Sequence, residues 1–419
     1  MHTVNLALAI AAGTVLALTL MSGWIKTHLW GSEAMICVLV GFALGPHGLH
    51  LAALDPVAND AHASWVEQAA RVTLSLSVMS AALSLPPGFM RAHLKPLALI
   101  LLPGMLLMWA ASAGIAFAFL ELSLLAALLA GAIVTPTDPV LARSIVAGRL
   151  ANEKTPDHAR RMITAESGAN DGLALPLVLF PLLLMDAGGE LASRSFGFLA
   201  WEVLGAFAIG WVIGQVTGRL FSLGHRHGFS EQKALTAITL SLAVFALAAV
   251  GLARADGILA VFVAGLVLNR AMSEEHQTQH EHFQDAVDRS LTLPIFILFG
   301  LILPLGSWLE HGWPLFLAAL LIVLARRLPA WLLLQLIGRP YRSWKEAMFA
   351  GWFGPVGVAA IFYAAFAAKH GASAMPWPLI SLVIFLSIFV HGISGTPLTK
   401  LYGRLTGSSG SGSSEGSDD

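Results

Sequence analysis

Long apolar runs of about twenty residues follow one another along most of the chain, separated by short polar connections. A helix needs roughly 20 mostly apolar residues to cross the hydrocarbon layer of a bilayer. The pattern therefore predicts an all-α polytopic membrane protein of about thirteen transmembrane helices. We expect these helices at residues 4–22, 33–51, 65–85, 96–119, 122–142, 159–184, 198–221, 233–251, 256–270, 287–305, 313–335, 345–367 and 377–398.

The connections between the runs are short, so residues 1–405 are predicted to form one transmembrane domain. Residues 406–419 are rich in Gly and Ser, carry no apolar anchor and are predicted to form a disordered tail. The first apolar run has no small-residue cleavage site behind it and is followed by Trp24, Lys26 and Trp30. We therefore expect it to be a retained helix and not a removed signal peptide.

Composition supports a membrane protein. Hydrophobic residues make up 56% of the chain and charged residues 12%, whereas soluble domains carry about 25% charged residues. This excludes a soluble enzyme. The net charge of −1 gives no reason to expect a nucleic acid partner, and the single cysteine, Cys37, excludes an intrachain disulfide framework.

The distribution of Lys and Arg predicts the orientation in the membrane. Loops after odd-numbered helices, with the C-terminus, hold 18 of these residues, and loops after even-numbered helices hold 3. Because basic loops stay on the cytoplasmic side, we expect the N-terminus outside and the C-terminus in the cytoplasm. The expected location is the cell (inner) membrane.

Two of the predicted helices carry helix breakers near their centres. Pro136 and Pro139 flank Thr137-Asp138 in the fifth helix, and Gly354 and Pro355 lie in the twelfth. Proline removes a backbone donor and disrupts the preceding turn, and irregular backbone at membrane depth must line a protected cavity. If the seventh helix connects two six-helix halves, the breaks occupy equivalent positions, which is a pointer to the substrate site of a transporter built from inverted repeats. Two ordinary proline kinks are the alternative.

Ionisable residues inside a bilayer are costly and mark functional sites. The candidates are Asp138 in the first break, Glu166, Ser167, Asn170 and Asp171 on the sixth helix, and Arg326 and Arg327 on the eleventh. Ser167 and Asp171 are four residues apart and share one helix face. With Asp138 and the freed carbonyl of Thr137, they would form an all-oxygen shell, which suits a hard cation.

The two carboxylates of the sixth helix are expected to differ in role. Glu166 is interpreted as the partner of Arg327 or Arg326 in a structural charge pair, with direct ion binding as the alternative. Asp171 is interpreted as the ion ligand. A proton and a cation both neutralise this carboxylate, so they compete for it, and only a neutralised site crosses easily between inward-facing and outward-facing states. Cation/proton exchange follows from that competition.

Three strings carry a resemblance to a known family: TPTDPVLARSIVAGRLA at 135–151, AESGANDGLALP at 165–176 and GWFGPVGVAAIFYA at 351–364. They resemble the monovalent cation:proton antiporters of the sodium/proton exchanger and NhaP group, most closely bacterial relatives of the fungal plasma-membrane sodium/proton antiporters. The resemblance covers residues 1–405. It implies two inverted six-helix repeats, crossing of the two broken helices, a homodimer, no cofactor, and a role in sodium transport and pH homeostasis.

The resemblance also implies roles for single residues. Asp171 would carry the transported ion or the proton, and Asn170 would be its partner in the Asn-Asp pair. Thr137, Asp138 and Ser167 would line the Na+ site, while Glu166 would be the structural carboxylate and Arg327 the family arginine of the eleventh helix. One departure is Val356, where many relatives have an arginine, so we expect one fewer buried positive charge and leave the coupling ratio open.

Several alternatives stay open. The transported cation is expected to be Na+, with Li+, and K+ is the alternative. An intramembrane aspartyl protease using Asp138 and Asp171, or a cation channel, are alternatives from other classes. Gly210, Gly214 and Gly218 form a small-residue ridge for packing within the protomer or in a dimer. The acidic loop with His276, His280 and His282 is interpreted as a solvated loop, with metal binding or pH sensing as the alternative.

Overall fold

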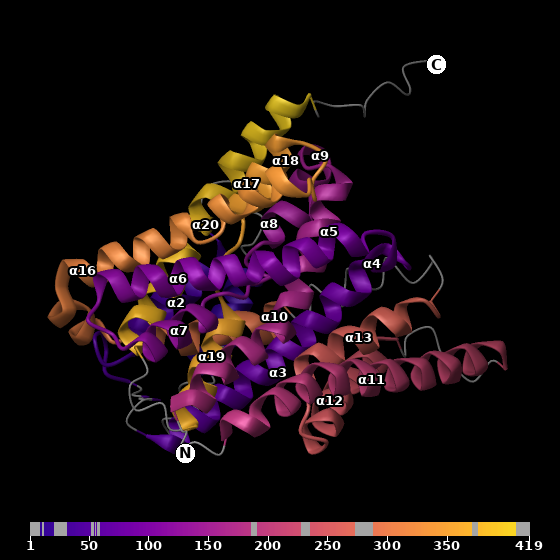
Figure 1. The fold of residues 1–419 in the computed structure, drawn as a ribbon, viewed down its shortest axis with the longest axis horizontal. Helices are drawn as coiled ribbons and strands as arrows, with labels where there is room; N and C mark the ends of the chain where they lie inside the picture. Colours follow the sequence, from indigo (N-terminus) through magenta and orange to yellow (C-terminus); the bar gives the residue numbers. More distant parts are fainter. Residues whose placement is uncertain are drawn as a thin grey trace.

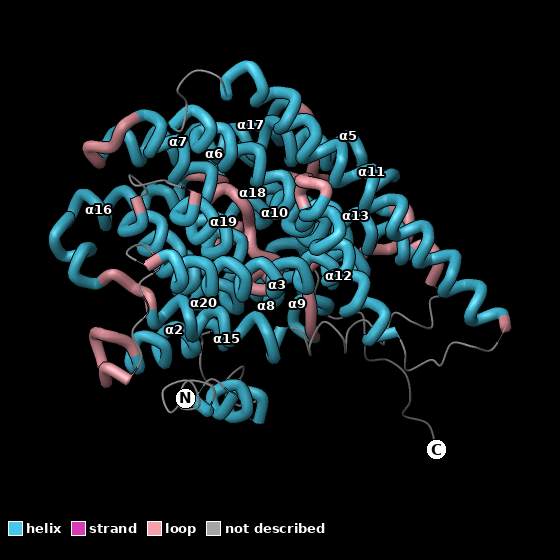
Figure 2. The backbone as a smooth tube through the Cα atoms, turned by 90° about the horizontal axis from the view of Figure 1, so that it is seen from below, coloured by secondary structure: helices cyan, strands magenta, loops and turns pink. Residues whose placement is uncertain are grey.

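The computed structural model describes residues 9–10, 12–20, 32–51, 54, 56, 59–185, 191–227, 235–272, 288–370 and 376–407, and every regular element in these ranges is a helix. Figures 1 and 2 show α11, α12 and α13 together on one flank of the molecule and α16 on the opposite flank, with α10 between them. The helices, with η for π-helical turns, are α2 (Glu33–Leu44), α3 (Asp60–Ser84), α4 (Phe89–Ala92), α5 (Leu94–Leu99), η1 (Ile100–Gly104), α6 (Met105–Phe119), α7 (Leu124–Ile133), α8 (Arg143–Val146), α9 (Arg149–Lys154), α10 (Asp157–Met185), α11 (Leu191–Arg226), α12 (Leu235–Leu252), α13 (Gly257–Asn269), η4 (Asp288–Thr292), α15 (Leu293–Leu301), α16 (Leu305–Ala325), α17 (Leu328–Ile337), α18 (Trp344–Trp352), α19 (Val358–Lys369) and α20 (Trp377–Thr406).

The described chain contains both long and short apolar helices. Six segments are long and apolar enough to cross a membrane, namely Leu94–Phe119, Asp157–Met185, Gly197–Gly224, Leu235–Leu252, Leu305–Ile337 and Trp377–Thr406. Shorter apolar helices, such as α2, α7 and α13, lie beside them. Large apolar side chains on α11, including Leu204, Phe207 and Trp211, are exposed, as expected for a surface that faces lipid. The chain is a multi-pass membrane protein.

Most predicted helices agree with the structure, and one of them contains a kink. The predicted helix at 313–335 lies within the segment Leu305–Ile337, which is interrupted where α16 ends at Ala325 and α17 begins at Leu328. Pro329 in the first turn of α17 has no backbone N–H, which favours a new helix start at that point. The interruption leaves Arg326 and Arg327 between two helices. Of the first predicted helix, 4–22, only residues 9–10 and 12–20 are described, and these are helical.

Both predicted helix breaks are present. The first lies between α7, which ends at Ile133, and α8, which begins at Arg143. The second lies between α18 and α19, where residues 353–357 are not helical. The two breaks meet, because the Asp138 N–H donates to the Pro355 carbonyl over 2.8 Å and the Val358 N–H donates to Asp138 Oδ2 over 2.7 Å. The inverted-repeat symmetry stays a prediction.

The helix that carries the candidate carboxylates, α10, packs against α3, α7, α13 and α19. Two glycines allow the close approach to α13. A Cβ atom on Gly168 would lie 2.6 Å from the Phe262 ring, and one on Gly172 would lie 2.7 Å from the backbone of Leu259. The side chains of Glu166, Ser167, Asn170 and Asp171 are therefore enclosed by protein and buried.

The small-residue ridge of α11 packs within the protomer. Gly210 lies against Ala260 and Gly214 against Ala264, where a Cβ atom would approach the carbonyl oxygens to 2.5 Å and 2.8 Å. The ridge therefore holds α11 against α13. The predicted solvated loop with His276, His280 and His282 and the tail beyond Gly407 lie outside the described residues.

Candidate functional site

Arg326 joins the carbonyl ends of the two interrupted helices. Its guanidinium donates to the carbonyl oxygens of Val134 over 2.6 Å and Thr135 over 2.9 Å, after α7 ends, and to the carbonyl of Gly354, after α18 ends. A helix C-terminus carries partial negative charge and unpaired carbonyl groups, which a cation stabilises. Arg326 is buried, with 1% of its surface exposed. The sequence analysis missed this role, and the second arginine beside Arg327 was the available signal.

Asp138 stabilises the amide ends at the same crossing. Its Oδ1 accepts from the N–H groups of Val140 and Leu141 over 2.8 Å and 3.1 Å, and its Oδ2 accepts from Val358 at the start of α19. Helix N-termini carry partial positive charge and free N–H groups, so a carboxylate suits this position. The structure thus gives Asp138 a role in holding the crossing together that the sequence analysis did not assign.

Three polar side chains meet where the first break passes α10. The Thr137 and Ser167 hydroxyls lie 3.0 Å apart, and Asn170 Nδ2 donates to Thr137 Oγ1 over 2.8 Å. Asn170 Oδ1 accepts from the Thr137 N–H over 3.2 Å. Asn170 therefore satisfies a backbone donor that the helix break leaves without a helical partner. The structure brings together these three residues, which the sequence analysis placed at the site.

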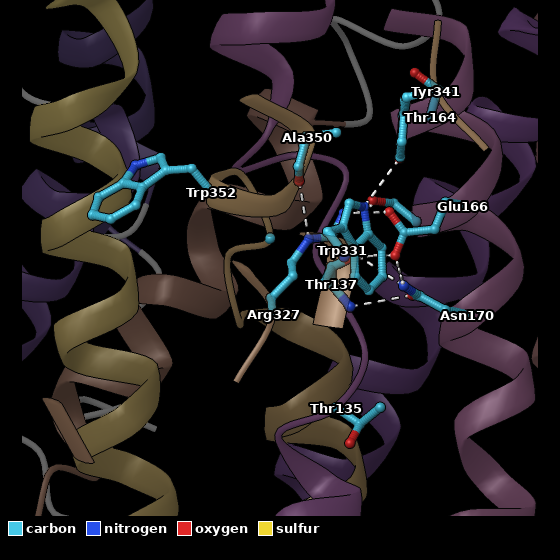
Figure 3. A network of polar contacts seen from close by, with 12 residues as sticks. Thr135, Thr137, Thr164, Glu166, Asn170, Arg327, Trp331, Tyr341, Ala350 and Trp352 are labelled. Carbon is cyan, nitrogen blue, oxygen red and sulfur yellow. Dashed lines mark hydrogen bonds and ion pairs between the residues drawn. The ribbon is translucent and has the colours of Figure 1, made fainter. Parts of the chain in front are cut away.

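Glu166 forms a buried ion pair with Arg327, one of the two arginines considered (Figure 3). The guanidinium binds both carboxylate oxygens, with N–O distances of 2.7 Å and 2.6 Å. Arg327 also donates to the Ala350 carbonyl and lies 4.0 Å from the centre of the Trp331 ring. Glu166 Oε1 accepts a further bond from Asn170 Nδ2 over 2.8 Å. The pair connects α10 to the start of α17 and to α18.

Asp171 differs from the other two carboxylates. It is fully buried, and within the described chain neither of its carboxylate oxygens has a hydrogen-bond partner. Only its backbone is bound, because the Tyr363 hydroxyl donates to its carbonyl oxygen. An isolated ionised carboxylate in a low-dielectric interior is strongly unfavourable. Within the described chain, no group compensates a negative charge on the Asp171 side chain.

The charges at the site leave one carboxylate without a balancing cation. The five ionisable groups are Asp138, Glu166, Asp171, Arg326 and Arg327, all at most 3% exposed. Arg327 neutralises Glu166 directly, and Arg326 and Asp138 compensate opposite ends of the same helix crossing. Val356 supplies no charge, but the positively charged Arg326 guanidinium donates a hydrogen bond to the carbonyl of Gly354, two residues before it. Asp171 alone remains uncompensated.

Comparison with known proteins shows the family. The sodium/hydrogen exchanger family, described as transmembrane, matches residues 12–401, and the chain belongs to it. A Na+/H+ antiporter of Schizosaccharomyces pombe is 31% identical over 96% of this chain and 91% of its own length. A second protein of that organism, a probable Na+/H+ antiporter, is 30% identical over 93% of this chain, which spans 55% of that relative's length.

A solved structure shows the same fold. The sodium proton antiporter MjNhaP1 of Methanocaldococcus jannaschii at pH 8 superimposes with a TM-score of 0.73 at 18% identity, over 96% of this chain and 98% of that one. The family consists of transporters and not enzymes, so the protease alternative is wrong. The site agrees with this, because Asp138 uses both oxygens for backbone N–H groups and Asp171 is not bonded to it.

Proposed function

We propose that this protein is a secondary active antiporter that exchanges Na+, and also Li+, for H+ by alternating access, with both ions competing for Asp171. The observation that carries the proposal is the buried Asp171 carboxylate, whose two oxygens have no partner in the described chain. A carboxylate that is not compensated by the protein takes either a proton or a hard cation. The antiporter relatives support Na+ as the cation, and K+ is the alternative.

The neighbouring residues have distinct parts in the proposal. Thr137 and Ser167 supply hydroxyl oxygens to the ion, because their hydroxyls lie 3.0 Å apart and Ser167 is four residues before Asp171 on α10. Asn170 orients Thr137 through two hydrogen bonds. Asp138 and Arg326 hold the crossing of the broken helices, and Glu166 with Arg327 holds α10 against α17 and α18.

The balance of charge suggests a one-for-one exchange. With Asp171 ionised, the site carries one negative charge more than its two guanidinium groups neutralise. One proton or one monovalent cation removes this charge, and either makes the site neutral. A neutral site avoids the desolvation penalty that opposes movement of the bare carboxylate through the protein. The empty, charged site then does not move between the inward-facing and outward-facing states. Because the site must carry one of the two ions in each direction, their movements are coupled.

The proposal also includes the surroundings of the protein. We place it in the cell (inner) membrane with the N-terminus outside and the C-terminus in the cytoplasm, on the strength of the Lys and Arg distribution. A homodimer follows from the family resemblance. The orientation is tested by replacing Cys37, introducing single cysteines into the loops and labelling them from each side of the membrane. Crosslinking in native membranes tests the dimer.

The central test is the exchange activity of the Asp171→Asn variant. Cation-driven pH change in proteoliposomes, measured with Na+, Li+ and K+ in turn, should be abolished for all three because the amide carries no charge to share. Asp157→Asn is the matched control, because Asp157 lies on the same helix but is exposed. Near wild-type exchange by Asp171→Asn would refute the proposal. Exchange of K+ without Na+ by the wild type would establish the K+ alternative.

A further inference from the structure

A second pair of acidic residues lies away from the helix crossing, on the α11–α13 flank. Glu202 is on α11, and Asp256 follows α12 and precedes α13. They are 7% and 2% exposed. The two residues are joined through the backbone, because the Asp256 N–H donates to the Glu202 carbonyl oxygen over 3.1 Å. Neither residue has a part in the mechanism above.

The Asp256 side chain does more than begin a helix. Its Oδ1 accepts from the N–H groups of Ile258 and Leu259 over 2.8 Å and 3.1 Å, which is an ordinary N-cap. Its Oδ2 is buried and has no partner in the part of the chain that the structure describes. An amide or a hydroxyl would cap α13 equally well, as Asn59 caps α3 and Ser123 caps α7. Capping α13 therefore needs neither the negative charge of Asp256 nor its Oδ2 atom.

Charged and titratable groups approach Asp256 from several helices. Arg71 on α3 and Glu202 on α11 both lie within electrostatic range of it. The Arg71 guanidinium donates over 3.4 Å to the carbonyl of Leu247, which lies five residues before the end of α12. Tyr363 on α19 lies within electrostatic range of Asp256, Glu202 and Asp171. Two carboxylates and one guanidinium leave one negative charge in excess.

This acidic pair lies next to the turn of α10 that carries Asp171. Gly172 packs directly on the backbone of Leu259, the residue whose N–H is bound by Asp256. Tyr363, on α19, donates its hydroxyl to the Asp171 carbonyl. The exposed fraction falls from 7% at Glu202 to 2% at Asp256 and 0% at Asp171. Of the three carboxylates, Glu202 is thus the most accessible and Asp171 the most deeply buried.

We propose that Asp256 and Glu202 form a second site for a monovalent cation or a proton, which passes the ion between the solvent and Asp171. The free Oδ2 of Asp256 is the ligand that the protein leaves open, and Arg71 limits the site to one excess negative charge, so it binds one ion. This proposal rests on the proposed function. It adds a binding step outside the crossing, at the connection between α12 and α13, beside Gly172 of α10.

The substitution Asp256→Asn separates the two roles of this residue, because asparagine caps a helix as well as aspartate but carries no charge. In proteoliposomes we expect the apparent Km for Na+ to rise about tenfold, the effect of one charge acting over several ångströms in a partly buried setting. The maximal rate at saturating Na+ should stay close to that of the wild type. Thermal unfolding in detergent should be unchanged, whereas Asp256→Ala should lower stability because it removes the cap.

Glu202→Gln provides a second, independent variant near the surface and should raise the Km in the same direction. Glu67→Gln is the control, since Glu67 is also a buried carboxylate but is already paired with Lys369 at 3.1 Å. Wild-type Km values in both Asp256→Asn and Glu202→Gln would overturn this site, as would an equal rise in Glu67→Gln. If the wild type itself showed no Na+-driven proton movement, the proposed function would fail, and this site with it.

Discussion

Neutralising Glu166 should destabilise the protein much more than neutralising a carboxylate whose basic partner is exposed to solvent. The Glu166 carboxylate binds Arg327 through two short hydrogen bonds, and the two side chains are 0% and 3% exposed. In Glu166→Gln, one guanidinium nitrogen loses its acceptor, because the glutamine side chain has a single oxygen and its amide group is a donor. The buried Arg327 then keeps the Ala350 carbonyl and the Trp331 ring as partners but lacks a counter-charge.

The expected cost follows from leaving a buried charge unpaired, which amounts to about 3–5 kcal/mol. The Glu67–Lys369 pair provides the comparison, because its Lys369 side chain is 41% exposed and remains hydrated when the carboxylate is removed. A pair of this kind is worth about 0–1 kcal/mol. The same chemical change, Glu to Gln, should therefore have clearly different effects at the two positions.

The assay is thermal unfolding of both variants in the same detergent, together with Na+-driven exchange in proteoliposomes. Adding Arg327→Met to Glu166→Gln removes both charges and should recover part of the lost stability, since the unpaired guanidinium is the cause of the loss. The reasoning would be refuted if Glu166→Gln unfolded at the same temperature as Glu67→Gln. A stable Glu166→Gln protein with a greatly altered Km for Na+ would instead assign Glu166 to the ion shell.

Two further predictions concern the shared carboxylate and the helix crossing. If Na+ and H+ exclude each other at Asp171, lowering the pH by one unit below the pKa of the site should raise the apparent Km for Na+ about tenfold and leave the maximal rate nearly unchanged. The same pH dependence should be measured when residues 276–282 are deleted. A Km that is constant with pH while the maximal rate collapses in acid would contradict this prediction. Gly357→Ala should destabilise the protein by about 1–3 kcal/mol, because its Cβ would lie 2.1 Å from Asp138 Oδ2. Gly306→Ala, where a Cβ meets no atom within 4 Å, is its control in thermal unfolding, and equal stability of the two variants would show that the crossing tolerates the methyl group.

Much of the fold was predictable from the sequence because its causes are local. Runs of about twenty apolar residues indicate spanning helices wherever a bilayer is the solvent. The breaks were predictable from Pro136 with Pro139 and from Gly354 with Pro355, because proline removes a backbone donor and disrupts the preceding turn. Proline alone does not decide the outcome, since α10 continues through Pro176 and Pro181. The scarcity of charge made Asp138, Glu166 and Asp171 conspicuous candidates. The kink in the predicted eleventh helix was not predicted, although Pro329 lies two residues after Arg327, where α16 ends and α17 begins.

The partners of these charged residues were decided by the tertiary structure. Arg326 and Arg327 are neighbours in sequence, and only the interruption between α16 and α17 directs one to the helix crossing and the other to Glu166. Asp138 was expected to bind an ion, but one of its oxygens accepts a hydrogen bond from the N–H of Val358, which is 220 residues away in the sequence. Periodicity specifies which face of a helix a residue occupies, whereas a hydrogen-bond partner depends on which other helix packs there. The free oxygens of Asp171 and Asp256 were visible for the same reason only after every neighbouring donor had been placed.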